Sequence, residues 1–367
     1  MLCPCGSRRA IADCFIHLVS PVLLIPRHFS PEPHQTRWRH IEREGLGTLQ
    51  RISESVLQHE YRFNDILPDF RAASRLFIFS DYSGTQTDKK ARYEFLSFLI
   101  FPIEAASEWN GARLSVRDSI LENRSLSFKA MNDGVRRRAL RHFLAAADTI
   151  PGLLATIAVS KRHQSLFRRG RMDMRLPELQ QFGHRNRDVF ERLLRVTHIL
   201  SFFLSSVSHP NQSFVWYSDE DDIAANPDRL KELGEIWRAA VTNIVPHAVP
   251  SLTIGTERDD EPSRSLSDLL AIPDLACGAW CQLMSRASAK AFIHAAPELS
   301  EALATLSTPA LQILSWFASA GLPLKRLFAI IDDPQPQNKV DYMCSIPPVL
   351  DGFKRTVEAV IASKHAG

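Results

Sequence analysis

The chain has 367 residues, of which 45% are hydrophobic and 23% are charged. This composition excludes a disordered chain and is sufficient for a large buried core, divided between two or more structural units. The net charge of +3 gives the whole chain no excess that would favour nucleic acid or an anionic membrane, so any such affinity must be local.

The six cysteines indicate a reducing compartment and not a disulfide-stabilised secreted protein. Three lie close together near the N-terminus, and Cys277, Cys281 and Cys344 are scattered through apolar sequence, where we expect core packing. The apolar stretch from Cys14 to Ile25 contains a histidine and a proline and lacks a small-residue cleavage site, which excludes a typical secretion signal. No run reaches the roughly 18 apolar residues that span a bilayer. We therefore expect a cytoplasmic protein with no membrane partner.

Residues 1–17 form a cysteine-rich tip. Cys3, Cys5 and Cys14 supply three thiolates and His17 supplies an imidazole. These four side chains have the chemistry and number of the ligands in a closed tetrahedral zinc site, although unliganded thiols remain the alternative. A site with four protein ligands leaves no position for a substrate, so we expect a structural or partner-binding zinc ion.

The sequence CPCGS at residues 3–7, followed by Cys14, resembles the SEC-C motif, a short zinc-binding motif of many bacterial proteins. Two positions depart from that motif. Arg8 replaces the usual second glycine, and Phe15 occupies the position of the fourth ligand, which leaves His17 as the substitute. The resemblance implies zinc at this tip and leaves its fourth ligand open.

The rest of the chain divides into three predicted regions. Residues 18–74 are a Pro-rich connector with a helix from about Gln35 to Glu60, residues 75–286 alternate strands with helices, and residues 287–367 have a helical pattern. In the middle region we expect strands at 75–81, 93–101, 153–160, 213–218 and 251–255. We expect helices at about 104–121, 133–148, 187–207, 227–243 and 267–286, with a short extended piece at 125–129.

This alternation predicts a mixed α/β sheet with helices on its faces. The first two strands are separated by a short turn that contains Gly84, so they are expected to pair as an antiparallel hairpin. Later strands, each reached through a helix, are expected to be parallel.

The first strand of this region ends on an acid. Leu76 to Phe79 are apolar, Asp81 follows, and Ser83 and Gly84 form a turn, so capping of that turn is one interpretation of the carboxylate. Asp274 supplies a second interpretation, because it lies within an apolar helix, where a lone carboxylate is costly unless it is paired or bound to a metal. Carboxylates that converge from distant elements are what Mg²⁺ or Mn²⁺ requires in a phosphodiesterase.

The segments DYSG at 81–84 and LAIPDLACG at 270–278 resemble two motifs of the ribonuclease-H-like family catalogued as domain of unknown function 3800. Members of that family open with a strand ending D-E-S-G and close with a helix reading L-Q-x-A-D-L-x-A-G. Tyr82 replaces the glutamate of the first motif and Pro273 replaces an alanine of the second. The resemblance covers about 75–286 and implies a ribonuclease-H-like sheet and a nuclease in which Asp81 and Asp274 bind Mg²⁺ or Mn²⁺.

Two further acids that the family carries are absent. Ser127 stands where a glutamate is expected before Lys129, and Ser160 stands where an aspartate is expected at a strand end. Asp219, or its neighbour Glu220, follows the strand at 213–218 and could replace them, although a solvated acidic turn is equally consistent. Two functions therefore stay open: a metal-dependent nuclease with Asp219 as third ligand, or a catalytically degenerate adaptor that binds partners through its zinc tip and helical C-terminus.

The segment from Lys161 to Arg195 is basic, with ten Lys or Arg side chains against four acids, a local excess of +6. Such a segment could follow a phosphate backbone without reading its sequence. A solvated loop and an arginine-faced helix are the alternative. The predicted nucleic-acid contacts lie at the start of the segment: Lys161, Arg162, Arg168, Arg169 and Arg171.

Overall fold

The computed structural model describes residues 37–41, 48–63, 65–84, 91–163, 187–260, 262–293, 297–334, 340–347 and 349–366. Its seven strands form one mixed sheet in the order β5-β4-β1-β2-β3-β6-β7. The strands are β1 (Arg75–Ser83), β2 (Tyr93–Pro102), β3 (Leu153–Ser160), β4 (Ser213–Ser218), β5 (Leu252–Thr256), β6 (Lys325–Pro334) and β7 (Val340–Ser345). The α/β class predicted from the sequence is confirmed.

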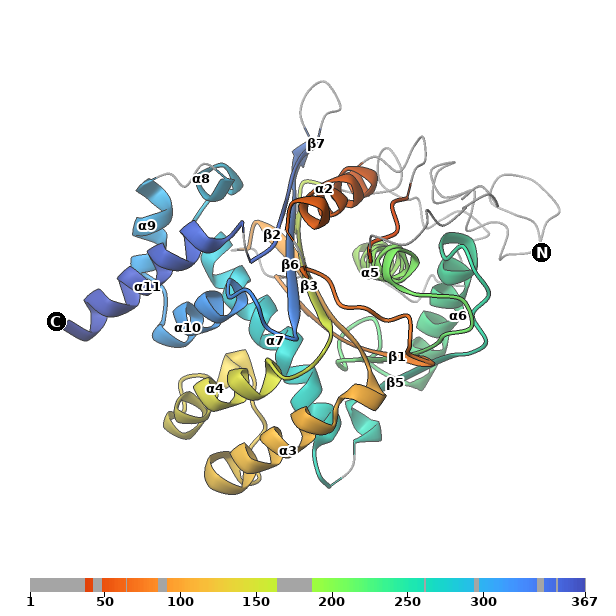
Figure 1. Ribbon diagram of the computed structural model, residues 1–367, viewed down its shortest axis with the longest axis horizontal. Coiled ribbons are helices and arrows are strands. Elements are labelled where there is room, and N and C mark those ends of the chain that lie inside the picture. The colour runs from red at the N-terminus through yellow and green to blue at the C-terminus, as the bar shows by residue number, and fades with distance from the viewer. Residues whose placement is uncertain are drawn as a thin grey trace.

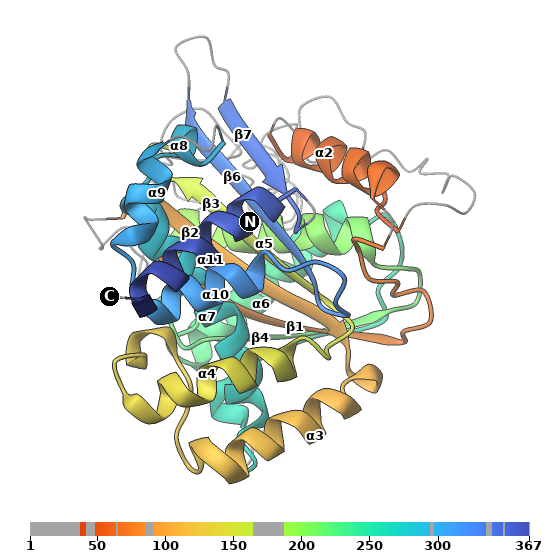
Figure 2. The same ribbon diagram turned by 60° about the vertical axis from the view of Figure 1, so that its left-hand side comes forward.

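Helices cover both faces of this sheet and make three layers (Figures 1 and 2). One face carries α2 (Thr48–Arg62), α5 (Arg187–Val207) and α6 (Pro227–Ile244). The other carries α3 (Ser107–Val116), α4 (Gly134–Ala147), α7 (Ser265–Met284), α8 (Ala289–Ile293), α9 (Pro297–Ala304), α10 (Thr308–Phe317) and α11 (Asp351–Ala366). Single turns of other helix types are η2 (Ile103–Ala105), η3, a π-helix (Arg117–Leu121), η4 (Phe128–Ala130) and η6 (Glu257–Asp259).

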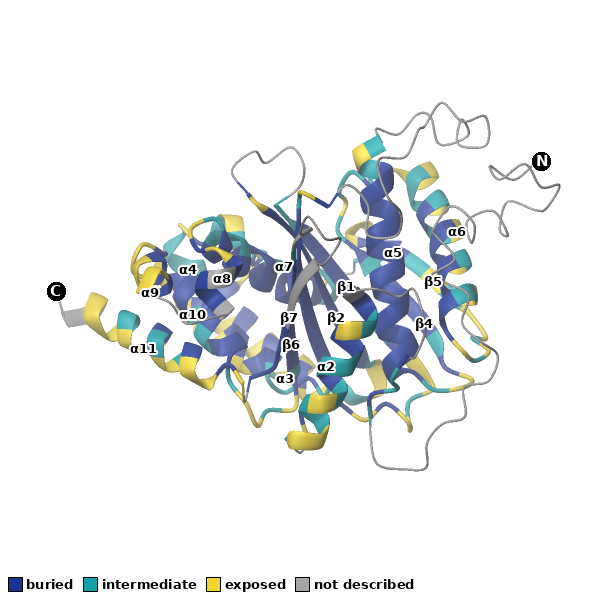
Figure 3. Ribbon diagram, turned by 90° about the horizontal axis from the view of Figure 1, so that it is seen from above, coloured by how far each residue is buried: buried dark blue, intermediate teal, exposed yellow. Residues whose placement is uncertain are grey.

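Each face of the sheet has its own hydrophobic core because side chains alternate along a strand. In β1, Leu76, Ile78 and Tyr82 belong to the core under α5 and α6, whereas Phe79 belongs to the core under α7. Asp81 has the same parity as Phe79 and therefore lies on the α7 side. Figure 3 shows that α5 is buried along nearly its whole length, so this helix is an interior element of its layer.

The strand directions agree with the expectation. β1 and β2 form the antiparallel hairpin, and β4 and β5 run parallel to β1. β3 pairs antiparallel with β2 and therefore runs in the same direction as β1, β4 and β5, as expected for the later strands.

The C-terminal region is not a helical appendage. It contributes β6, which pairs in parallel with β3, and β7, which pairs antiparallel with β6. Leu327, Phe328 and Ile330 of β6 are fully buried in the two cores, so residues 75–286 do not form a separate sheet. The strong helical stripe between Pro297 and Phe317 concealed the strand that follows it.

Two smaller expectations also change. The predicted helix from Gln35 starts only at Thr48, since residues 37–41 are not helical, and the extended piece at 125–129 ends in the η4 turn. The cysteine-rich tip, with Cys3, Cys5, Cys14 and His17, lies outside the described residues. In the part of the chain that the structure describes, no helix has the length and apolarity that a bilayer crossing requires.

Candidate functional site

An acidic pocket of about 390 Å³ lies where the parallel strands β1, β4 and β5 end. The carboxyl ends of parallel strands are the usual place for a ligand site in an open α/β sheet. Six carboxylate side chains line this pocket, against two cations, Lys129 and Arg192. The six are Asp81, Asp219, Asp221, Asp222, Glu257 and Asp274. The pocket therefore brings together all three acids that the sequence predicted as metal ligands.

Asp81 supplies the most deeply buried carboxylate of this pocket. Its side chain is 7% exposed, and its Oδ2 atom has no hydrogen-bond partner among the described residues. Burial raises the pKa of the Asp81 carboxyl well above its ordinary value, and the negative charges of Asp274, Asp219 and Asp221 raise this pKa further. The Asp81 carboxylate is thus costly in isolation, and capping of the turn by its other oxygen would leave the Oδ2 atom unsatisfied.

Asp274 enters the pocket from α7. Ser267, Leu270, Ala271 and Asp274 follow the three- and four-residue spacing of one helix face, and all four line the pocket. The backbone N–H of Phe128 donates a hydrogen bond of 2.6 Å to Asp274 Oδ2. Burial raises the pKa of Asp274 to about 6; the charge of Asp219 adds to this rise, whereas the Phe128 hydrogen bond and Lys129 oppose it.

Two contacts fix α7 in this position. Gly278 lets η4 approach closely, because a Cβ atom there would lie 2.2 Å from Cγ of Phe128. At the start of the helix, Asp268 is 1% exposed and accepts two hydrogen bonds of 2.6 Å from Arg117. Cys277, as expected, packs in the core, where its thiol donates to the backbone oxygen of Asp81 at 3.2 Å.

The acidic run after β4 is not a simple solvated turn. The backbone N–H of Asp219 bonds to the backbone oxygen of Ser80 in β1 at 3.4 Å, and Asp219 and Asp221 both line the pocket. Burial raises the pKa of Asp221 to about 6, although the Arg192 guanidinium opposes this rise. Glu220 does not line the pocket; it pairs with Arg258 at 2.5 Å. Of the two replacement acids weighed in the sequence, Asp219 is the one in the pocket.

Arg192 of α5 joins this run to the interior of the sheet. Its guanidinium is buried, lies 2.7 Å from Asp221 and 3.0 Å from Glu94, and also pairs with Asp222. It stacks over the ring of Tyr82 with 5.1 Å between the guanidinium carbon and the ring centroid. Tyr82 thus packs against the cation that holds the acidic run in place.

The basic segment is only partly a solvent-exposed surface. Arg192 is buried, and so is Arg195, which also pairs with Glu94, so these two arginines are not available to a phosphate backbone. Lys161 and Arg162 follow β3 and do not line the acidic pocket. The remaining predicted contacts, Arg168, Arg169 and Arg171, lie outside the described residues.

The two serines at expected acidic positions lie in different places. Ser127 lines the pocket beside Lys129, whereas Ser160 is buried at the end of β3 and does not line it. Within the described ranges, no three His, Cys, Asp or Glu side chains are grouped closely enough to hold a metal ion. The carboxylates therefore share one pocket without forming a ready ligand set.

Sequence reasoning missed four charged residues of the pocket: Asp221, Asp222, Glu257 and Arg192. The first two belong to an acidic run that the sequence did single out. Glu257 could have been found as the first acid after a parallel strand, which is also where Asp219 lies. Arg192 has a weaker signal, since it is one of five Asp, Glu or Arg side chains in α5 and nothing in the sequence distinguishes it from the others.

No family model matches the chain, and a search of curated proteins and of solved structures finds no match either. The function must therefore be argued from the pocket itself.

Proposed function

We propose that this protein is a divalent-metal-dependent phosphodiesterase, a nuclease or nuclease-like enzyme on a ribonuclease-H-like sheet. The observation that carries the proposal is the pocket in which Asp81 and Asp274, from distant parts of the chain, meet Asp219. An antiparallel hairpin followed by parallel strands, with helices on both faces, is the sheet that the family resemblance implies. The resemblance in sequence and the pocket thus support the same chemistry.

The donor types in the pocket suit a hard cation, although the described acids do not form a ready group of three. Mg²⁺ and Mn²⁺ prefer carboxylate oxygens, and the unpartnered Oδ2 of Asp81 is an oxygen that a cation would satisfy. Asp81, Asp219 and Asp274 would hold the ion. A bound ion of this kind supplies a lowered pKa for a coordinated water and a positive charge beside the phosphate oxygens.

The other side chains of the pocket hold these acids in place and balance their charge. The Phe128 N–H orients the Asp274 carboxylate, and Arg192 fixes the acidic run that contains Asp219 and Asp221. Lys129, which also lines the pocket, is placed to attract an anionic substrate towards a pocket that would otherwise repel it. Ser127 stands where the family that the chain resembles has a glutamate, so this position supplies no carboxylate. Asp219 would replace the missing ligand.

The test is cleavage of labelled DNA and RNA by the purified protein with Mn²⁺ or Mg²⁺. We expect Asp81→Asn and Asp219→Asn each to lower the cleavage rate by at least about 100-fold. Changing a residue that only hydrogen-bonds to a metal ligand typically lowers activity by about 10- to 100-fold, and loss of a ligand itself should cost at least as much. Glu220→Gln is the matched control, because Glu220 belongs to the same acidic run but pairs with Arg258. Cleavage that survives Asp81→Asn would contradict the assignment.

A second function is favoured by one observation, the lack of a metal-ready group of three side chains among the described residues. On that reading the protein is a binding module that retains the sheet without catalysis, and Cys3, Cys5, Cys14 and His17 form a zinc tip that binds a protein partner. Absence of cleavage with every substrate and metal, together with partner binding that Asp81→Asn leaves unchanged, would select this function.

A further inference from the structure

Helix α4 carries a one-sided basic surface. Its 14 residues contain four arginines and one histidine and no acid. Its apolar side, which includes Leu140 and Phe143, packs in the core under the sheet. Arg137, Arg138, Arg141 and His142 follow one another at helical spacing on the opposite side and are exposed. Among the described residues, no ion pair engages any of these four side chains.

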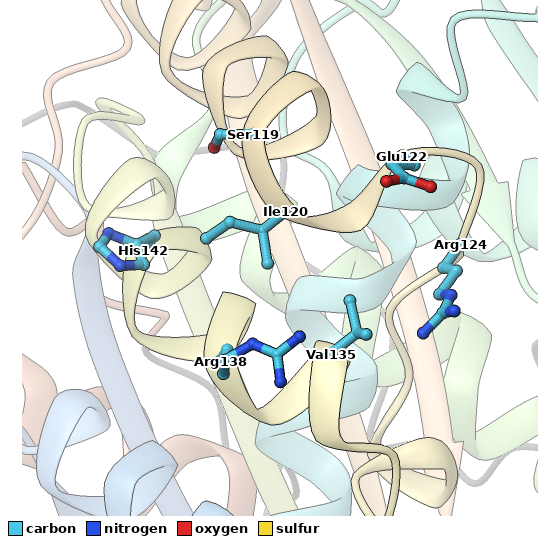
Figure 4. Close-up of a pocket in the computed structure, with 7 residues that line it drawn as sticks. All are labelled: Ser119, Ile120, Glu122, Arg124, Val135, Arg138 and His142. Atoms are coloured by element: carbon cyan, nitrogen blue, oxygen red, sulfur yellow. The ribbon is translucent and has the colours of Figure 1, made fainter.

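A hollow of about 520 Å³ lies between α4 and the π-helical turn η3. Figure 4 shows Arg138 and Val135 of α4 across from Ile120 of η3, with Arg124 at one end of the hollow. Three of the lining residues, Arg124, Arg138 and His142, can offer N–H donors to an anion, whereas one acid, Glu122, lines the same space. The hollow extends the basic surface of α4 towards the segment that precedes the helix.

That segment, residues 121–130, is also a wall of the acidic pocket. Arg124 lines the hollow, whereas Ser125, Ser127 and Lys129 line the pocket, so the two spaces share a short stretch of chain. The Arg136 Nε–H donates to the backbone oxygen of Ser125 at 2.7 Å, which ties α4 to this wall. Lys129 and Arg124 therefore lie on this shared stretch of chain, where Arg124 also pairs with Asp133 at the start of α4 at 3.4 Å.

A polyanion that reaches the acidic pocket needs cations outside it, because six carboxylates repel its phosphates. Of the arginines described in the segment after β3, Arg192 and Arg195 cannot serve, since both are buried in ion pairs with Glu94. We propose that the basic face of α4, with Arg124 and Lys129, binds the phosphate backbone of the nucleic acid strand whose phosphodiester enters the acidic pocket. This inference rests on the proposed phosphodiesterase function and assigns the surface that holds its substrate.

The experiment compares two triple variants of the full chain. The first removes Arg137, Arg138 and Arg141 by substitution with Ala, which suits an exposed helix position and leaves the fold intact. The control removes three exposed cations elsewhere, with Lys231→Ala and Arg238→Ala on α6 and Arg286→Ala after α7. Binding of labelled single-stranded DNA and RNA is measured by fluorescence anisotropy in EDTA over a range of salt concentrations.

We expect the α4 variant to bind at least about tenfold more weakly at low salt, and its slope of log K against log salt to fall by about 2, as three lost phosphate contacts on a single strand require. The control variant is expected to bind like the wild type. Unchanged binding by the α4 variant, or an equal loss in the control, would overturn the inference. So would equally tight, α4-dependent binding of polyglutamate or anionic vesicles, because the face would then serve a different partner.

The two proposals fail in different ways. Cleavage that requires Asp81 but is indifferent to the α4 substitutions at low substrate concentration keeps the phosphodiesterase and removes the α4 surface. Nucleic-acid binding that depends on α4, without cleavage in any divalent metal, keeps the surface and removes the phosphodiesterase. Because binding is measured in EDTA, the binding result does not depend on metal chemistry in the pocket.

Discussion

Several carboxylates of the acidic pocket lie where burial disfavours their charged form. Asp81, Asp221 and Asp274 all have a pKa raised chiefly by burial, and each lies within the field of at least one other acid of the same pocket. A structural carboxylate is normally paired or hydrogen-bonded enough to offset its burial. The Oδ2 atom of Asp81, which has no partner among the described residues, is what we expect of a position that serves the proposed ligand and not stability.

The raised pKa values predict an unusual dependence of stability on pH in the absence of divalent metal. Asp274 and Asp221 have a pKa of about 6 in the folded state and 3.8 ordinarily, so the folded state binds more protons between these values. These groups therefore make their largest contribution to the free energy of unfolding below about pH 4, and this contribution is lost as the pH rises through 6. Thermal unfolding in EDTA is expected to show a midpoint a few degrees higher at pH 5 than at pH 7.

The variant Asp274→Asn isolates this contribution, because it removes one titrating group of the pocket. The loss of stability between pH 5 and pH 7 is expected to be smaller in this variant than in the wild type. Glu235→Gln, on the exposed side of α6, is the control and should follow the wild type. Identical pH profiles for wild type and Asp274→Asn would show that the pocket carboxyls titrate normally.

At this scale the sequence predicts the acids that interrupt apolar elements and misses their partners. Asp81 and Asp274 could be found because each is a carboxylate within an otherwise apolar strand or helix. Arg192 and Asp221 could not be paired in advance, because their contact joins α5 to the loop after β4 and depends on how those elements pack. The same packing explains why Arg195, predicted as part of a basic segment, is instead buried against Glu94.

At the scale of elements, the contact between η4 and α7 sets the geometry of the pocket. Gly278 admits the Phe128 ring against the helix, and the backbone N–H of the same phenylalanine then reaches Asp274. The wall that carries Ser127 and Lys129 is held by this contact. The strand and helix bounds of the region were largely predictable from apolar runs, whereas this close approach, which depends on a single missing side chain, was not.

Gly278→Ala is expected to destabilise the fold by about 1 to 3 kcal/mol, since the new methyl group overpacks the contact with Phe128. The exposed Gly111 in α3 has nothing within 4 Å of its Cβ position, so Gly111→Ala is expected to be neutral or stabilising by about 0.5 to 1 kcal/mol. Chemical denaturation measures both. Adding Phe128→Ala to Gly278→Ala should recover part of the loss through relief of the clash, and equal stability of the two glycine variants would contradict this account.

At the scale of the whole molecule, one continuous sheet brings the pocket residues together. The acids at or after the ends of β1, β4 and β5 lie at the same edge of the sheet. Helix α7 covers them on one face of the sheet, and Arg192 reaches them from α5 on the other face. The C-terminal strands extend this sheet beyond β3, so the region predicted as an appendage is part of the fold. Local pattern cannot reveal that extension, because a short apolar run such as LFAII at 327–331 is compatible with a strand or a buried helix until its neighbours are known.

The most direct test of the central claim is calorimetric titration of the metal-free protein with Mn²⁺, in wild type and in Asp81→Asn. We expect saturable binding by the wild type and an affinity at least about tenfold lower in the variant, in line with the effect of even indirect changes at metal sites. The cysteine-rich tip is the same in both proteins, so it cannot produce the difference. Absence of Mn²⁺ binding, or binding that Asp81→Asn leaves unchanged, would contradict a metal site in the acidic pocket.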